Sequence, residues 1–183
     1  MTSMIARSPA TIDDLRKVPK DGRVYELVDG AIVVTPAGMR HSAVSARVTV
    51  ILGSFVLPRH IGEVYTEGVG IHLPTGNVRS PDTCFVRHEK LPGGRSPVDY
   101  GHVVPDLVVE VLSPGDNPRH IAKKVDEYLA CGVPLVWLVD PERRTVTVHR
   151  PDQDVVVRGG DDEVTAEPVL PGFACRVSEF FPE

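Results

Sequence analysis

The stretch PDLVVEVLSP, residues 105–114, carries apolar side chains on both alternation phases of an extended chain. Its β-branched valines fit a pleated strand better than a helix, and apolar residues on both faces are typical of a strand that is covered on both sides. Between residues 103 and 112 the only charged residues are Asp106 and Glu110. We therefore expect Glu110 to be substantially buried, where an ionised carboxylate needs a cation, a hydrogen-bond network or a metal ion.

The same kind of patterning predicts helices and strands along the rest of the chain. Capping residues, helical spacing of apolar residues and terminating Pro or Gly residues predict helices at 11–17, 41–57 and 118–131. β-Branched and aromatic residues between Gly and Pro predict strands at 24–34 (a hairpin turning at Asp29-Gly30), 62–73, 78–86, 102–112, 135–139 and 145–149. Residues 87–102 form the longest separator and are expected to be a mobile loop.

This order of elements predicts an α+β domain organised around one central, mixed β-sheet flanked by helices, with additional hairpins near both ends of the chain. The length suits a single domain, residues 1–183, in which residues 1–22 form a short helical lead-in. We see no run that approaches the roughly 20 apolar residues of a membrane-spanning helix. The N-terminus lacks the apolar centre of a signal peptide, and three scattered cysteines without Cys-x-x-Cys spacing fit a reducing compartment. A cytoplasmic protein without membrane contact is therefore expected.

The net charge of −5 and the pI near 5.8 argue against tight, non-specific binding to nucleic acid. They do not exclude an enzyme that acts on nucleic acid, because bound divalent cations or a local basic patch reverse the field at a small site. The candidates for such a patch are Arg87, His88, Lys90, Arg95, Arg119, Lys123 and Lys124, although solvated loops and helix faces account for most such residues.

Lys124 is a candidate partner for Glu110. On a helical wheel of 3.6 residues per turn, Ile121 and Tyr128 share one face of the predicted helix 118–131. Lys124 borders that face, whereas Lys123 points away from it. Because this helix follows the Glu110 strand after a short turn, packing it back against the sheet would bring Lys124 close to the Glu110 carboxylate.

Asp82 supplies the second half of a candidate site. It follows Pro81 at the start of a strand that precedes the Glu110 strand, and neighbouring strands lie about 4.8 Å apart. Two carboxylates beside a lysine form an oxygen-rich site suited to Mg²⁺ or Mn²⁺. Phosphodiester hydrolysis is the reaction that this set of side chains fits best.

A purely structural interpretation competes with this one. Glu110 and Lys124 could form a buried ion pair, and Asp82 could be a turn residue after Pro81. Asp106 is harder to place, because it lies four residues from Glu110, about 13 Å along an extended strand. It either begins the strand or contacts a second metal ion.

The chain resembles a known family in the order of several motifs. They are YELVDG at 25–30, His41, SPD at 80–82, PDLVVEVLSP at 105–114, Lys124 with Tyr128 and Gly132-Val133, WLVDP at 137–141, and LPGF at 170–173. In this combination the sequence is similar to the Uma-two family of restriction endonucleases, within the PD-(D/E)XK nuclease superfamily. The resemblance extends over nearly the whole chain from about Tyr25.

The resemblance implies a restriction-endonuclease-like core, a Mg²⁺ or Mn²⁺ cofactor, and DNA as the partner. Residue by residue, Asp82 and Glu110 match the two acidic, metal-binding positions. The usual lysine two residues after the second acid is replaced by Leu112. The lysine that the family carries on the following helix matches Lys124.

Glu26 and His41 also match positions of the family. Glu26 would add a carboxylate to the site, whereas His41 could equally be a hydrogen-bonding residue at a helix start.

Several functions stay open at this point. The resemblance favours a metal-dependent endonuclease acting on DNA. Alternatives are a catalytically degenerate nuclease fold that binds nucleic acid or serves in assembly, a phosphodiesterase acting on RNA or small nucleotides, and an oligomer that uses strand 135–139 and its hairpin as a subunit interface. A homodimer is also plausible, because cleavage of a duplex needs two cuts.

Overall fold

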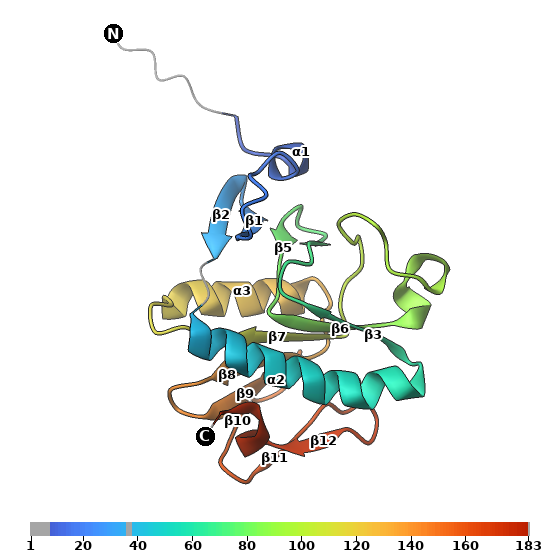
Figure 1. The fold of residues 1–183 in the computed structure, drawn as a ribbon, viewed down its shortest axis with the longest axis vertical. Helices are drawn as coiled ribbons and strands as arrows, with labels where there is room; N and C mark the ends of the chain where they lie inside the picture. The colour runs from blue at the N-terminus through green and yellow to red at the C-terminus, as the bar shows by residue number, and fades with distance from the viewer. Residues whose placement is uncertain (1–7, 36–37, 183) are drawn as a thin grey trace.

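The computed structural model describes residues 8–35 and 38–182 (Figure 1). At its centre is a six-stranded sheet with the order β10-β9-β8-β7-β6-β3. These strands are β3 (Gly62–Thr66), β6 (Thr83–Arg87), β7 (Leu107–Val111), β8 (Val136–Asp140), β9 (Thr145–His149) and β10 (Val156–Gly159). β7 and β8 run parallel, whereas the other neighbours are antiparallel. The predicted α+β fold with a central mixed sheet is confirmed.

Two long helices, α2 (Met39–Val56) and α3 (Pro118–Ala130), cover opposite faces of this sheet (Figure 1). The side chains of β7 alternate between them: Val109 packs in one apolar cluster with Val48 of α2, and Val108 packs in another with Val125 of α3. All five residues of β7 are buried. β7 is therefore covered on both faces, which is the environment expected for Glu110.

A second sheet is formed by β2 (Ala31–Thr35), β1 (Val24–Val28), β5 (Val78–Arg79) and β4 (Ile71–His72), in that order. With the short helix α1 (Ile12–Leu15) it lies at one end of the molecule (Figure 1). The structure thus divides each of the strands predicted at 62–73 and 78–86 into two strands that belong to different sheets. The first break is a turn at Glu67-Gly68, where Gly68 has a φ of +90°, and the second is Ser80-Pro81-Asp82. Asp82 consequently lies where the chain passes from the second sheet to the central sheet.

The helix boundaries follow the capping residues closely. The side chain of Asn117 accepts a hydrogen bond from the backbone N–H of Arg119 at the start of α3, and Gly132, with a φ of +92°, follows its end. α2 continues into the 3-10 turn η1 (Leu57–Arg59). By length and mean hydropathy, 1.2, Met39–Arg59 could cross a membrane. However, Val48 and three further apolar residues of α2 are completely buried in the core, which accounts for the apolar character of this helix.

The predicted helix at 11–17 and the predicted loop at 87–102 differ from the structure. The predicted helix 11–17 is limited to Ile12–Leu15, and the first seven residues of the predicted lead-in lie outside the described residues. Residues 87–102 contain two 3-10 turns, η2 (His88–Lys90) and η3 (Pro92–Gly94), and the Ser96 and Tyr65 hydroxyls lie 2.7 Å apart. The loop therefore has local structure of its own.

The C-terminal segment packs against the central sheet. β11 (Glu163–Thr165) pairs with β12 (Ala174–Arg176), and η4 (Val177–Phe180) follows. Phe180 lies 6.0 Å from Trp137, measured between ring centroids, and Trp137 of β8 is fully buried. Strand 135–139 is thus an internal strand of the core, and this position disfavours its use as a subunit interface.

Candidate active site

Asp82 and Glu110 meet at the end of the central sheet where β6 begins and β7 ends. Thr83 of β6 pairs with Val109 of β7 in an antiparallel register. Extending this register by one residue places Asp82 opposite Glu110. Directly opposite residues of antiparallel strands lie on one face of the sheet, with Cβ atoms about 5 Å apart. Oδ2 of Asp82 accepts a hydrogen bond of 2.7 Å from the backbone N–H of Val111. Both acidic residues line a pocket of about 760 Å³.

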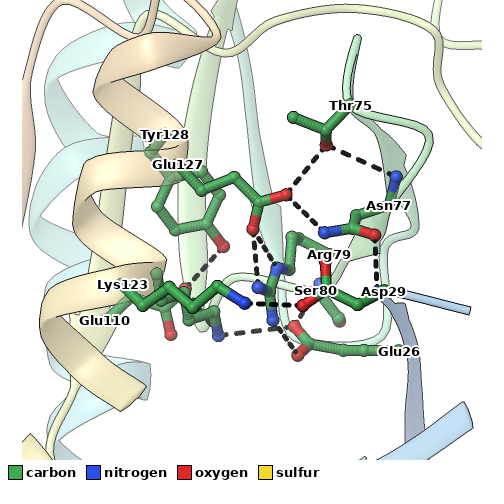
Figure 2. Close-up of polar contacts among 11 residues, drawn as sticks. Glu26, Asp29, Thr75, Asn77, Arg79, Ser80, Glu110, Lys123, Glu127 and Tyr128 are labelled. Carbon is green, nitrogen blue, oxygen red and sulfur yellow. Dashed lines mark hydrogen bonds and ion pairs between the residues drawn. The ribbon is translucent and has the colours of Figure 1, made fainter. Parts of the chain in front are cut away.

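Glu110 is only 6 % exposed, and one of its oxygens makes two contacts. Oε1 accepts a hydrogen bond of 2.7 Å from the Tyr128 hydroxyl, and Figure 2 shows these two side chains facing each other. The same oxygen lies 2.9 Å from Nζ of Lys124. Burial raises the pKa of Glu110 to about 7, although the charge of Lys124 acts in the opposite direction. Tyr128 was not among the predicted site residues. Its spacing of four residues from Lys124, on the same side of the helix, is the signal that could have identified it.

Lys124 lies between two carboxylates. Its Nζ atom is 2.9 Å from Glu110 and 3.3 Å from Oε1 of Glu26. Burial favours the neutral amine, but the Glu110 and Glu26 carboxylates outweigh this effect and raise the pKa of Lys124. Lys123, by contrast, has a side chain that is 67 % exposed, and its Nζ atom lies 2.6 Å from Oδ2 of Asp29. Figure 2 shows this pair. The prediction that Lys124 faces Glu110 while Lys123 points away is confirmed.

Glu26 reaches the site from β1. Its side chain is buried, and Oε1 accepts a hydrogen bond of 2.7 Å from the backbone N–H of Ser80, two residues before Asp82. Its other oxygen, Oε2, lies 3.3 Å from Nη1 of Arg79. Both oxygens of Glu26 are thus engaged by protein groups, which makes Glu26 a partner of Lys124 rather than a free ligand.

His41 lies at the start of α2 and contacts Asp82. Its Nε2 atom is 3.1 Å from Oδ2 of Asp82, and because a carboxylate only accepts, Nε2 donates. This hydrogen bond raises the pKa of His41, against the opposing effect of burial. Together with the exposed Glu67, these two residues offer three ligand atoms within 4.8 Å of one another. Glu67 was not predicted, because only the folded turn after β3 brings it to Asp82.

Asp106 lies apart from this cluster, at the opposite end of β7. Its Oδ1 atom is 2.9 Å from Nζ of Lys90, and its Oδ2 atom accepts a hydrogen bond from the backbone N–H of Arg87. In the same loop His88 lies 3.3 Å from Glu63. Asp106 thus lies directly before β7 and holds the loop. Five of the seven residues considered for a basic patch have acidic neighbours: Arg87, His88, Lys90, Lys123 and Lys124.

The donor set fits a divalent cation. Among the described residues no group donates to Oδ1 of Asp82 or to Oε2 of Glu110, so each carboxylate keeps one oxygen for a ligand. When all are ionised, four carboxylates (Glu26, Asp82, Glu110 and Glu127) lie beside two cationic side chains (Arg79 and Lys124), which leaves two negative charges before Glu67 or any proton on His41 is counted. Carboxylate oxygens are the ligands that Mg²⁺ and Mn²⁺ prefer.

Binding of such a cation should weaken as the pH falls below about 7. A metal ion binds the ionised form of Glu110, whose pKa is raised to about 7 by burial. Above this pH the carboxylate is already ionised, and below it the metal must displace a proton, which lowers the affinity about tenfold per pH unit. A proton on His41, beside Asp82, would repel the cation and would therefore also weaken its binding as the pH falls. Calorimetric titration with Mn²⁺ from about pH 5.5 to about pH 8.5 measures the effect, and an affinity that is constant across this range would contradict it.

Comparison with known proteins places the chain in a family. A family model, Uma2, described as "Putative restriction endonuclease", matches residues 12–178. Among solved structures, a crystal structure of "a putative nuclease belonging to DUF820 from Anabaena variabilis" superposes with a TM-score of 0.83 at 25% sequence identity. The match covers 94% of this chain and 98% of that chain.

No curated protein matches the chain. The superposition confirms the nuclease-type fold that the resemblance implies. Because the family model matches residues 12–178 of 183, this chain belongs to the Uma2 family.

Proposed function

We propose that this protein is a metal-dependent endonuclease that hydrolyses phosphodiester bonds of DNA in the pocket lined by Asp82, Glu110 and Lys124. The observation that carries the proposal is the pair of buried carboxylates, each with one oxygen left for a ligand, beside a partly buried lysine. The family description as a restriction endonuclease and the nuclease described for the Anabaena variabilis structure support this chemistry.

Asp82 and Glu110 would hold the metal ion. A bound Mg²⁺ or Mn²⁺ supplies a more acidic water molecule and offsets the negative charge of the phosphate. The two contacts on Oε1 of Glu110, from Tyr128 and Lys124, orient the carboxylate so that Oε2 is the oxygen left for the cation. His41 acts in the same way on Asp82, because its hydrogen bond and that of Val111 both engage Oδ2.

Lys124 has the position and charge to stabilise the reacting phosphate group. Its ammonium group lines the pocket and stays protonated beside two carboxylates. There it can donate hydrogen bonds to a water molecule or to a phosphoryl oxygen, and it stabilises the negative charge that develops in the transition state. Leu112, which occupies the position of the usual lysine, lines the same pocket, and its apolar side chain has no hydrogen-bond donor. The helix therefore supplies the cation that the strand lacks.

Part of the pocket lining suits a polyanionic substrate. It contains Gly38, Met39 and Arg40 at the start of α2, a helix without acidic residues in its first turn. The N-terminal end of a helix carries partial positive charge and favours phosphate groups. The family description supports DNA as the proposed substrate, and a homodimer would allow both strands of a duplex to be cut.

Cleavage should require Mg²⁺ or Mn²⁺ and should be poorly supported by Ca²⁺, because the larger and more variable Ca²⁺ coordination sphere positions water less well. The assay incubates the purified protein with supercoiled DNA, linear duplex, single-stranded DNA and RNA, each with Mg²⁺, Mn²⁺, Ca²⁺ or a chelator. Cleavage that survives exhaustive chelation would refute the proposal. Selective cleavage of RNA would indicate that the same site acts on RNA rather than on DNA. Nucleic-acid binding without metal binding or cleavage would indicate a degenerate nuclease fold.

A further inference from the structure

Arg79 connects the candidate site to a carboxylate outside it. Its side chain is 8 % exposed and lies between Glu26 and Glu127 (Figure 2). Nε and Nη2 donate hydrogen bonds of 2.8 and 2.6 Å to Oε2 of Glu127, and Nη1 donates one of 3.3 Å to Oε2 of Glu26. A planar guanidinium can serve two carboxylates at once, which a lysine ammonium does with less defined geometry.

Glu127 is itself held by three residues of one segment. Its other oxygen, Oε1, accepts hydrogen bonds of 2.8 Å from the Thr75 hydroxyl and 2.6 Å from the side-chain amide of Asn77. Burial opposes ionisation of Glu127, but these hydrogen bonds and that from Arg79 outweigh it and keep the pKa of Glu127 below its usual value. Glu127 is therefore a fixed negative charge to which Arg79 is anchored.

These contacts form a chain of alternating charges with both ends on α3. Lys124 pairs with Glu26, Glu26 with Arg79, and Arg79 with Glu127. Lys124 and Glu127 are three residues apart and share one side of the helix, whereas Glu26 comes from β1 and Arg79 from β5. The position of Lys124 relative to Glu110 is thus set from outside the pocket by the second sheet.

We propose that Arg79, anchored by Glu127, is a positioning residue that keeps Lys124 shared between Glu26 and Glu110. Without Arg79, Glu26 has Lys124 as its remaining cationic partner among the described residues. Lys124 is then drawn toward Glu26 and away from Glu110 and the pocket. This role rests on the proposed nuclease function, in which Lys124 serves the substrate.

A double-mutant cycle tests whether Arg79 acts through Lys124. Arg79→Gln should lower kcat about tenfold, with KM for DNA and the Kd for Mn²⁺ changed less than about twofold. In the Lys124→Met background, Arg79→Gln should lower kcat hardly any further, because the lysine that Arg79 positions is absent. Equal losses in both backgrounds, or a loss of Mn²⁺ affinity parallel to the loss of activity, would overturn the proposal.

Glu127→Gln is the second variant, used if Arg79→Gln does not fold. It releases the anchor of Arg79 with one atom changed, and its effect on kcat should be non-additive with Lys124→Met in the same way.

A measurement that does not depend on catalysis tests the role of Arg79 separately from the nuclease function. In the folded protein, acylation of the Lys124 amine by an amine-specific reagent is followed by mass spectrometry, with the exposed Lys123 as internal reference. Arg79→Gln should slow acylation of Lys124 relative to Lys123 by about threefold or more, at the lower end of couplings between contacting side chains. Unchanged relative acylation would overturn the positioning role even if the enzyme is active. Slower acylation in a protein that cleaves nothing would leave the positioning intact and refute the nuclease function alone.

Discussion

Glu110→Gln should abolish DNA cleavage, with a loss of about 10³-fold or more in kcat, and should remove the rise in melting temperature that Mn²⁺ causes in the parent protein. The substitution keeps the size and the hydrogen-bonding shape of the side chain but removes the charge that would hold the metal. It also exchanges one buried carboxylate oxygen for a nitrogen, next to the donors of Tyr128 and Lys124. Thermal melts with and without Mn²⁺, alongside the cleavage assay, measure both effects.

The purely structural interpretation of Glu110 predicts a different result. If Glu110 and Lys124 are only a buried ion pair, Glu110→Gln removes one of the two carboxylates beside Lys124. The free energy of unfolding then falls by less than about 3–5 kcal/mol, the cost of a buried charge left unpaired, because Glu26 still lies beside Lys124. The melting temperature would then fall, and Mn²⁺ would affect neither protein. Glu142→Gln is the matched control, because Glu142 lines the same pocket but is exposed and belongs to the turn after β8. It should melt, bind Mn²⁺ and cleave DNA as the parent does.

Lys124→Met should lower kcat by about 10²- to 10³-fold while metal binding persists. Methionine keeps an unbranched side chain as far as Cε but removes the ammonium group that faces Glu110 and the pocket. Because Glu26 and Glu110 then lose a shared cation, the site becomes more negative, and Mn²⁺ should bind as tightly as in the parent protein or more tightly. Single-turnover cleavage and calorimetric titration with Mn²⁺ measure the two quantities separately.

Lys123→Met provides the control for this variant. Lys123 precedes Lys124 on the same helix, but its ammonium is exposed and pairs with Asp29 at the surface. The median contribution of such exposed pairs is about 0–1 kcal/mol, so that activity and stability should hardly change. Equal losses in the two lysine variants, or loss of Mn²⁺ binding in Lys124→Met, would contradict the role assigned to Lys124.

Local patterns in the sequence determined the environment of individual side chains. The apolar residues on both phases of 105–114 predicted a strand covered on both faces, and Glu110 is buried in β7. Helical spacing placed Lys124 on the side of α3 that faces the sheet and Lys123 on the exposed side. These predictions succeed because the period of a strand or a helix is a property of neighbouring residues, so that which face a side chain occupies is already encoded within a few positions.

Only the tertiary structure decided how separate segments complete the site. Residues 78–86 read as one apolar strand, yet their division between two sheets at Ser80-Pro81-Asp82 depends on pairing with β1 and with β7. The Glu26 contact to Ser80 joins residues 54 positions apart, and the Arg79 contact to Glu127 joins residues 48 apart. Asp106 lies just before β7 and Glu110 near its end, each with its own partners. Spacing along the chain carries no information about such encounters, because they depend on which strands pair and where each helix packs. The sequence by itself therefore determined the buried acid and the helix face that carries its lysine, and the folded chain decided which carboxylates and which arginine surround them.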